Sequence, residues 1–418
     1  MNCIPRKEVF MEVISGGVTK PKGFKAANTA AGIKYVDRDD MAMIVSKSPC
    51  VAAGTFTRNV VKAAPVLFDK RIVEESTDIH TVVINAGIAN ACTGEEGFGY
   101  CNETAKAAQT ALGFGDNSTL VASTGVIGMQ LPIDKVKAGV VKLSQNLGDT
   151  EEAGLKAAQA IMTTDTKPKQ CAVHVPMSDG TEVTIGAMAK GSGMIHPDMC
   201  TMLCFITTDC NIDKQLLQEA LSSVVCDTFN MISVDGDTST NDTCVVLANG
   251  EAHNTKITKE DKDFIAFSEG LFYVAREIAM KMAGDGEGAT ALFEVKAIHC
   301  RDKQEAKTFA KSVITSNLTK AAIFGHDANW GRILCALGYS GASFDPAKVD
   351  IIVESVNGKI DLVKDGVATD YSEEAATKVL SAEKVTCICD MKQGIACATA
   401  WGCDLTYDYV KINADYRS

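Results

Sequence analysis

The sequence predicts a mixed α/β (α+β) protein, in which short buried strands combine with amphipathic helices. Two apolar runs, residues 80–87 and 118–124, are typical of buried strands. Residues 264–282 carry large apolar side chains at spacings of three and four, which is the pattern of a helix with one buried face. From residue 292 to residue 380, candidate strands and helices alternate, as they do in layered α/β proteins.

The helices can be placed in order along the chain. One is expected over residues 134–147, where four apolar side chains share a face, and the clearest covers 264–282, with Gly284 as a stop signal. Near the end of the chain, Asp370 and Glu373 fit a capping box that would begin a further helix. The two apolar faces consist of Val136, Val140, Leu143 and Leu147, and of Phe264, Phe267, Leu271, Val274, Ile278 and Met282.

The composition is that of a soluble globular protein. The 418 residues suffice for one large domain or two to three ordinary ones, and 46% are hydrophobic and 22% charged. No stretch has the roughly 18 uncharged apolar residues that a membrane span needs, and the start of the chain does not resemble a secretory signal. The net charge of −12 comes without a basic stripe. We therefore expect a cytoplasmic protein with no membrane and no nucleic-acid partner.

The cysteines and histidines do not form a recognisable metal site. Sixteen cysteines are scattered along the chain, and in a reducing cytoplasm we expect free thiols. The tightest group, Cys387, Cys389, Cys397 and Cys403, lacks the paired spacing of zinc ligands. Cys387 and Cys389 alternate as on one face of a strand, so we expect core packing. The six histidines show no ligand spacing either, and we expect no metal.

The centre of the chain has an unusual pattern. A Gly-rich turn with Lys190, Ser192 and Pro197 leads without a linker into an apolar strand at 202–207. Hydroxyl residues between a tight turn and a buried strand are what an internal nucleophile would need. An ordinary turn before a strand has the same pattern, so this segment alone leaves both interpretations open.

Several motifs in order resemble the ornithine acetyltransferase family, whose members make arginine precursors. GSGMIHPDMCTMLCFITTD (191–209) resembles the self-cleavage segment of that family, and the resemblance covers nearly the whole chain. The other matching segments are GGVTKPKGFKAA (16–27), NAGIANACTGEEG (85–97), STGVIG (123–128), SVDGDTSTNDT (233–243), GDGEGAT (284–290), FGHDANWGRILCALGYSG (324–341) and DLTYDYVKINADYRS (404–418).

This resemblance implies a fold and a processing event. The fold would be a layered sandwich of sheets and helices of the N-terminal-nucleophile type, with a smaller C-terminal α/β subdomain at about 292–395. Self-cleavage would give an alpha fragment, 1–200, and a beta fragment, 201–418. The fragments would stay associated, as a heterotetramer of two alpha and two beta fragments.

The resemblance places the cut between Cys200 and Thr201. A threonine hydroxyl is a poor nucleophile and needs a base beside it. Once Thr201 is the first residue of a chain, its own α-amino group, with a pKa of about 7.7–8.0, can serve as that base. The family usually has Ala before the threonine, so Cys200 is a departure, and its thiol lies next to the bond to be cut.

Acetyl transfer would then proceed in two half-reactions. Thr201 would take the acetyl group of N-acetyl-ornithine, and glutamate would remove it as N-acetyl-glutamate. The resemblance assigns the oxyanion hole to Thr124 and Gly125, because a strand ending in Ser-Thr-Gly can present a hydroxyl and a backbone N–H together. In the preceding strand, Ala86 and Ile88 replace the family's usual Ser and Asn.

The remaining site residues follow from the same resemblance. Lys190 would bind the substrate α-carboxylate, and Glu287, in a Gly-rich segment, would hold the ornithine ammonium group. Thr164, Asn413 and Ser418 complete the substrate set, with Ser418 where the family usually has Thr. The GDGEGAT segment lacks the Gly-Lys-Ser/Thr ending of a phosphate loop, so we reject nucleotide binding.

We expect no cofactor, with acetyl-CoA as the one co-substrate left open. His196, near the cut, is a candidate for proton transfer, and the acidic segment 233–243 is interpreted as a structural turn near the active site. Two other functions remain open. A self-cleaving aminopeptidase of related architecture would release the acyl group to water, and a binding module would have kept the fold without the chemistry.

Overall fold

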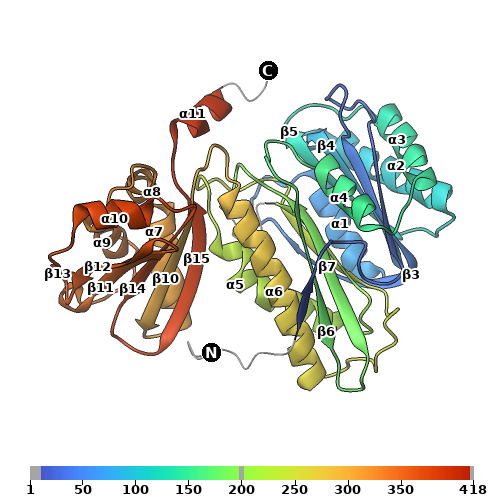
Figure 1. The fold of residues 1–418 in the computed structure, drawn as a ribbon. Coiled ribbons are helices and arrows are strands. Elements are labelled where there is room, and N and C mark those ends of the chain that lie inside the picture. The colour runs from blue at the N-terminus through green and yellow to red at the C-terminus, as the bar shows by residue number, and fades with distance from the viewer. Residues whose placement is uncertain (1–10, 197–201, 415–418) are drawn as a thin grey trace.

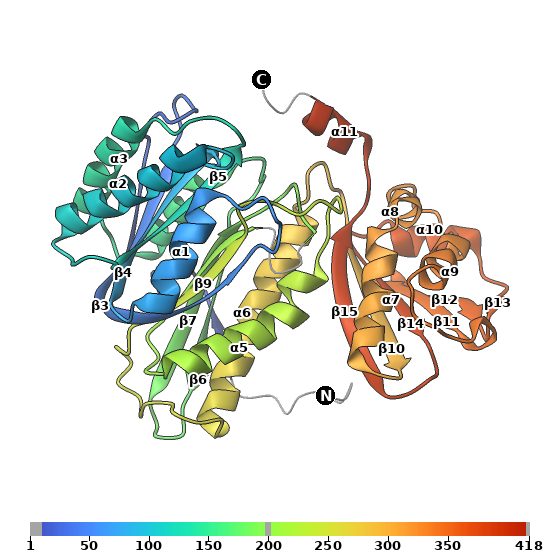
Figure 2. The ribbon, with the colours of Figure 1, turned by 180° about the vertical axis from the view of Figure 1, so that it is seen from behind.

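The computed structural model describes residues 11–196 and 202–414. The protein contains two β-sheets with helices packed on them. The mixed α/β prediction is therefore confirmed. Figure 1 shows a larger part, blue to yellow, beside a smaller part, orange to red, with helix α6 facing the smaller part. The view from behind in Figure 2 shows the same arrangement, with α11 standing away from both sheets.

The elements of the larger part run from β1 to α6. Its strands are β1 (Glu12–Ile14), β2 (Phe24–Thr29), β3 (Met41–Phe56), β4 (Ile79–Ile88), β5 (Thr119–Val126), β6 (Lys169–Pro176), β7 (Glu182–Lys190), β8 (Leu203–Thr208) and β9 (Thr243–Ala248). Its helices are α1 (Ala64–Glu75), α2 (Gly94–Leu112), α3 (Ile133–Gln145), α4 (Glu151–Ala160), α5 (Lys214–Asp227), the 3-10 turn η1 (Phe229–Met231) and α6 (Lys262–Gly284).

The elements of the smaller part follow α6. Its strands are β10 (Leu292–Cys300), β11 (Asp350–Ser355), β12 (Gly358–Lys364), β13 (Val367–Ala368), β14 (Lys384–Asp390) and β15 (Ala396–Cys403). Its helices are α7 (Lys303–Thr315), α8 (Asn317–Phe324), α9 (Trp330–Gly338), the turn η2 (Pro346–Lys348) and α10 (Glu373–Leu380), and α11 (Tyr407–Ala414) comes last.

The larger sheet is held together by one long strand. Its order is β1-β6-β7-β8-β9-β3-β4-β5, with β2 also paired to β3. The first part of β3, from Met41 to Cys50, pairs with β4, while Val51–Phe56 pairs with β9. Strand β8, which follows the predicted cut, lies between β7 and β9.

Burial on both faces explains why these strands have nearly continuous apolar sequences. In β9, Cys244 and Val246 pack into the core against α5 and α6, while Val245 and Leu247 pack into the core on the other face. A strand covered on both sides loses the alternation of apolar and polar residues. The strands predicted at 80–87, 118–124 and 202–207 are confirmed as β4, β5 and β8.

The two predicted helices are confirmed as α3 and α6. In α6 the expected face is buried except for Phe264, which is partly exposed, and the helix ends at Gly284 as predicted. The predicted capping box at Asp370 and Glu373 is wrong. The Ser372 hydroxyl accepts the Ala375 N–H instead and begins α10, because an N-cap serine immediately before the helix satisfies an otherwise unpaired donor.

The smaller sheet has the order β13-β12-β11-β14-β10-β15. Cys387 and Cys389 lie in β14, buried in the core as predicted. Of the described cysteines, thirteen are free, while Cys397 is disulfide-bonded and so departs from the expectation of free thiols. Among the described residues, no helix is long and apolar enough to cross a membrane.

Candidate active site

A cavity of about 400 Å³ brings together the candidate residues from distant parts of the chain. It lies where β5, β7 and β8 meet the segment after α6, and Met194 and Met202 line it on either side of residues 197–201. Cys200 and Thr201 lie outside the described residues, as does Ser418. The candidate residues that line the cavity are Thr124, Gly125, Thr164, Lys190, Glu287 and Asn413.

The candidate oxyanion hole lies at the end of β5. Thr124 is buried, and Gly125 has a φ of +131°. A Cβ atom on Gly125 would lie 2.2 Å from the carbonyl carbon of Gly87 in the neighbouring strand, so only glycine fits here. Thr124 and Gly125 both line the cavity at this strand end.

The two departures from the family pattern lie directly beside Thr124. Ala86 and Ile88, in β4, both take register positions opposite Thr124 in β5. Both side chains are buried. The substitutions therefore change apolar packing behind the candidate oxyanion hole.

Lys190 ends β7 and is almost fully buried, with its side chain 10% exposed. Burial lowers its pKa, and the Asp165 carboxylate, 4.0 Å from its Nζ, opposes that decrease. Lys169 lowers the pKa further, while Glu287 and Asp242 raise it. The charge of this lysine therefore depends on a balance of neighbouring groups.

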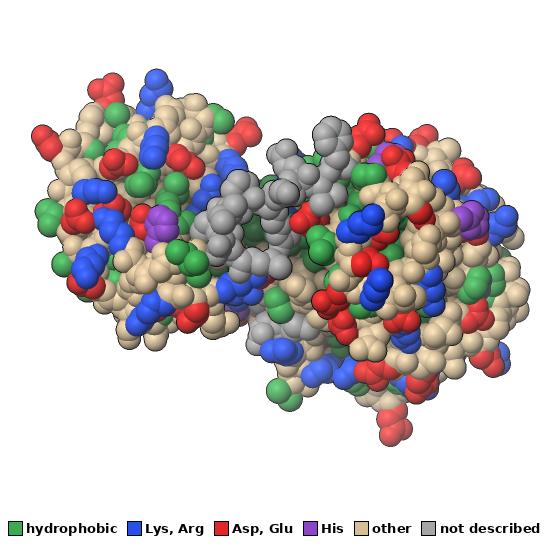
Figure 3. Space-filling model, turned by 90° about the horizontal axis from the view of Figure 1, so that it is seen from below, with side chains coloured by type: hydrophobic (Ala, Val, Ile, Leu, Met, Phe, Trp, Pro, Cys, Tyr) green, Lys and Arg blue, Asp and Glu red, His purple; other side chains and the backbone are tan. Residues whose placement is uncertain are grey.

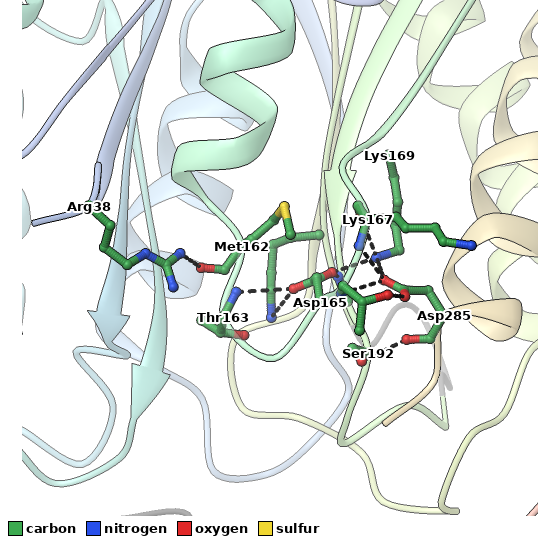
Figure 4. Close-up of polar contacts among 11 residues, drawn as sticks. Arg38, Met162, Thr163, Asp165, Lys167, Lys169, Ser192 and Asp285 are labelled. Atoms are coloured by element: carbon green, nitrogen blue, oxygen red, sulfur yellow. Dashed lines mark hydrogen bonds and ion pairs between the residues drawn. The ribbon is translucent and has the colours of Figure 1, made fainter. Parts of the chain in front are cut away.

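Asp165 is the centre of a buried charge network (Figure 4). Its carboxylate accepts hydrogen bonds from Lys169 Nζ at 2.7 Å, from Gly191 N at 2.7 Å and from Thr163 N at 3.1 Å. Burial opposes its ionisation, but the Lys190 and Lys169 cations lower the pKa of Asp165 to about 2. Asp165 is thus an anion at neutral pH, and it connects the 163–169 segment to the turn after Lys190.

Asp285 extends the network to the segment that carries Glu287. Its carboxylate lies 2.6 Å from Lys169 Nζ and accepts hydrogen bonds from the N–H and hydroxyl groups of Thr166. Its carbonyl accepts the Ser192 hydroxyl at 2.7 Å, and the Glu287 N–H donates to the Ser192 carbonyl at 3.0 Å. Lys190 and Glu287 are therefore held by one framework.

Glu287 receives a contact from the last described helix. Asn413 Nδ2, on α11, donates to Glu287 Oε2 at 2.7 Å. The carboxylate has room because Gly193 lies opposite, where a Cβ atom would come within 2.3 Å of the Glu287 carboxyl carbon. One oxygen of Glu287 is thus fixed by an amide, and its carboxylate borders the cavity.

The predicted structural turn at 233–243 is confirmed. The Asp235 carboxylate accepts the N–H groups of Met194 and Ile195 at 2.6 and 2.9 Å, and so holds the segment that leads to residue 197. At the other end of the turn, Asn241 Nδ2 donates to the carbonyls of Ala89 and Ser123 at 2.6 and 2.8 Å. The turn thus joins the segment before the predicted cut to the end of β5.

His196, the candidate for proton transfer, has its ring Nδ1 3.1 Å from the Ser233 hydroxyl. Its carbonyl accepts the Thr238 hydroxyl at 2.8 Å. In this structure His196 therefore fastens the approach segment to the 233–243 turn.

Sequence reasoning missed the charged framework of the site. Asp165 lies next to Thr164 in the same segment, and Asp285 lies in the GDGEGAT motif, yet neither was singled out. The local signal in each case was an acidic residue within two positions of a candidate site residue, Thr164 or Glu287. Lys169 pairs with Asp285, which lies 116 residues further along the chain, and nothing in the local sequence indicates such a pairing.

Comparison with known proteins gives consistent matches. A family model described as the ArgJ family matches residues 25–418. The chain is 51% identical over 401 residues to arginine biosynthesis bifunctional protein ArgJ 1 of Clostridium acetobutylicum, covering 96% of this chain and 97% of the relative. It is 49% identical over 410 residues to arginine biosynthesis bifunctional protein ArgJ of Symbiobacterium thermophilum, covering 98% and 100%.

A solved structure with a related sequence is the ornithine acetyltransferase of Mycobacterium tuberculosis in complex with ornithine. It is 42% identical to this chain, covers 46% of this chain and 100% of its own, and superposes with a TM-score of 0.42.

Proposed function

This chain belongs to the ArgJ family, and we propose that it transfers the acetyl group of N-acetyl-L-ornithine to L-glutamate in arginine biosynthesis. The observation that supports this most is the convergence of Thr124, Gly125, Thr164, Lys190 and Glu287 on one cavity. The cavity also borders both sides of the segment that contains Thr201. The cavity lining combines a lysine, a glutamate and the end of β5, which together can bind both charged groups of an amino acid and face its acetyl group.

The first step is self-cleavage. The Thr201 hydroxyl attacks the Cys200 carbonyl, the peptide C–N bond breaks, and the nitrogen becomes the α-amino group of Thr201. Water then hydrolyses the resulting ester and restores the hydroxyl. The hydrogen bonds of Asp235 to Met194 and Ile195 support this step, because they fix the chain just before the cut.

The second step is acyl transfer by a ping-pong mechanism. The Thr201 α-amino group accepts the hydroxyl proton as the oxygen attacks the acetyl carbonyl, and ornithine leaves with a proton on its nitrogen. Glutamate attacks the acetyl ester in the same way and leaves as N-acetyl-glutamate. The Thr124 hydroxyl and the Gly125 N–H stabilise the oxyanion, and each such donor typically contributes about 2.7–4 kcal/mol.

Substrate recognition divides between opposite charges. Protonated Lys190 binds the α-carboxylate that both substrates share, and Glu287 binds the side-chain ammonium group of ornithine. Thr164, Asn413 and Ser418 complete the substrate site, with Asn413 acting through its hydrogen bond to Glu287.

The reaction needs no cofactor or metal, and acetyl-CoA is the one alternative acetyl donor left open. The fragments 1–200 and 201–418 assemble as two copies of each, and the enzyme works in the cytoplasm.

The decisive experiment separates a transferase from an aminopeptidase. Purified protein is incubated with N-acetyl-ornithine, with and without glutamate, and ornithine and N-acetyl-glutamate are measured. We expect sustained ornithine release only with glutamate, and N-acetyl-glutamate in equal amount. Release at the same rate without glutamate would overturn the proposal, and acetyl-CoA with glutamate in a parallel reaction tests the second donor.

A further inference from the structure

A second cavity, of about 530 Å³, lies between α6 and the smaller sheet. Its walls come from α6, α7, β10, β14 and β15, from the end of α5 and from η1. It shares no lining residue with the candidate active site. The two cavities are therefore separate.

Positive charge dominates the lining of this cavity. Five cationic side chains, Arg276, Lys296, Lys303, Lys307 and Lys384, face only two carboxylates. The protein as a whole has a net charge of −12, and the face in Figure 3 mixes acidic and basic side chains over both parts. A concave surface with this excess of cations focuses a positive potential.

Each of the two carboxylates is shared by two lysines. Asp227 contacts Lys303 and lies 2.8 Å from Lys307 Nζ. Glu294 lies 3.1 Å from Lys384 Nζ and 3.4 Å from Lys296 Nζ. A single negative charge divided between two ammonium groups leaves positive charge that a ligand can compensate.

The other carboxylates that pair with these cations lie outside the lining. Glu277 is 2.9 Å from Arg276, and Glu354 is 3.8 Å from Lys296. Both of these carboxylates are partly exposed to solvent, so they are screened. They reduce the positive potential in the cavity without cancelling it.

The titration of the two lining carboxylates agrees with this geometry. Burial opposes ionisation of Asp227, yet the Lys303 and Lys307 cations lower its pKa below the ordinary value. Burial likewise opposes ionisation of Glu294, and the hydrogen bond from Trp401, with the charges of Lys384 and Lys296, lowers its pKa. Both groups therefore experience a positive surrounding.

We propose that this cavity binds a small phosphate-bearing polyanion with at least two negative charges, at a site separate from acyl transfer. Lysine ammonium groups are compact charges that suit phosphate oxygens. Trp401 is 3% exposed, and its indole N–H donates to Glu294 at 2.7 Å, which holds one acid of the site in place. Phe272 and Met280, on α6, form an apolar wall for the uncharged part of the ligand.

The test is calorimetric titration of the full-length protein with inorganic pyrophosphate as the probe. We expect one binding site per chain, with affinity that decreases as salt is added. Citrate, which carries carboxylates and no phosphate, serves as a parallel probe and should bind more weakly. If citrate bound as tightly as pyrophosphate, the assignment of a phosphate ligand would be overturned. Saturating N-acetyl-ornithine should leave the pyrophosphate affinity unchanged.

Two matched variants make the test specific. Lys303→Gln with Lys307→Gln removes two lining charges, and Lys348→Gln with Lys378→Gln removes two lysines of the same part that do not line the cavity. We expect the first pair to weaken pyrophosphate binding by about tenfold or more, and the second to leave it unchanged. Equal losses in both pairs, or no pyrophosphate binding to the unmodified protein, would overturn the proposal.

A third variant keeps every ion pair in place. Thr399, in β15, lines the cavity, and Thr399→Glu adds a negative charge there without removing a lysine. It should abolish pyrophosphate binding, whereas Thr399→Gln should retain it. Retained binding in Thr399→Glu would contradict the site even if the lysine variants failed to fold.

Discussion

The Lys169 ammonium group lies 2.7 Å from the Asp165 carboxylate, and both side chains are almost completely shielded from solvent. Asp165 also lies 4.0 Å from Lys190 Nζ and opposes the effect of burial on that lysine. We therefore regard Asp165 as a positioning residue that favours the charged form of Lys190. Lys169 acts on Lys190 with the opposite sign.

Asp165→Asn should impair substrate binding in a pH-dependent way. Without the carboxylate, the pKa of Lys190 decreases further, so KM for N-acetyl-ornithine should rise, by about tenfold, and should begin to rise at a lower pH than in the unmodified enzyme. The measurement is KM and kcat between about pH 6 and pH 10.

Lys169→Met is the matched control for this effect. Removing the second cation raises the pKa of Lys190, because Lys169 lowers it in the intact site. The pH at which KM rises should therefore move in the opposite direction from Asp165→Asn. If the network had only a structural role, the pH at which KM rises would shift in the same direction in both variants.

Acid stability should also depend on Asp165. Its pKa is about 2 in the fold, below the ordinary value of 3.8, so its stabilising contribution is present above about pH 4 and is lost as the pH falls towards 2. The contribution amounts to about 2 kcal/mol. In urea unfolding from pH 7 to pH 3, Asp165→Asn should be less stable at neutral pH and should lose less stability on acidification. If the free energy of unfolding depended on pH in the same way in Asp165→Asn and in the unmodified protein, the lowered pKa of Asp165 would be contradicted.

Gly125→Ala should lower kcat by more than a loss of fold stability alone would explain. The added Cβ would collide with the backbone of Gly87, displace the end of β5 and misplace the proposed oxyanion donor. We expect kcat to fall by about 100-fold or more. Gly128→Ala is the control, because Gly128 also has a positive φ, of +83°, but has open space around its Cβ position. It should lower stability by about 1 kcal/mol and largely preserve kcat.

Asn413→Ala should weaken recognition of ornithine. Glu287 would lose the amide that fixes one of its oxygens, so KM for N-acetyl-ornithine should rise several-fold to about tenfold, while KM for glutamate changes less. Lys411→Ala, an exposed position on the same helix, should leave both constants unchanged. Equal effects on the two substrates would argue that Asn413 supports the site without discriminating between them.

Thr201→Ala should abolish the cut. On a denaturing gel the unmodified protein should give two bands of nearly equal size, and Thr201→Ala a single band near 44 kDa. Thr201→Ser retains a hydroxyl and should still be cut, at a lower rate. Cys200→Ala restores the family's usual residue, and a faster cut in that variant would show that the thiol slows the reaction. A single band for the unmodified protein would contradict self-cleavage.

The sequence predicted the local elements better than the long-range contacts. Strands such as β4 and β5 were recognisable because burial on both faces leaves an uninterrupted apolar run. Helix α6 was recognisable because its buried face repeats over six turns of chain. The start of α10 was misplaced by two residues, since Asp370 and Ser372 are both good N-caps and only the path of the backbone decides between them.

The candidate site shows the same division. Thr124, Lys190 and Glu287 could be named because each lies in a segment that resembles a motif of the family. The contact of Lys169 with Asp285, and that of Asn413 with Glu287, join positions more than a hundred residues apart. Such pairs are set by the sheet order and the packing of α6 and α11, which one sequence does not reveal.

The position of β8 and β9 between β7 and β3 has a thermodynamic consequence. A cut before residue 201 would leave two strands of the second fragment inserted in a sheet built from the first. The fragments could then separate only by breaking the ladders on both sides, and unfolding would change from a one-chain to a multi-chain equilibrium. The melting temperature of the cut protein should therefore increase with protein concentration, while that of an uncut variant should be less sensitive to dilution.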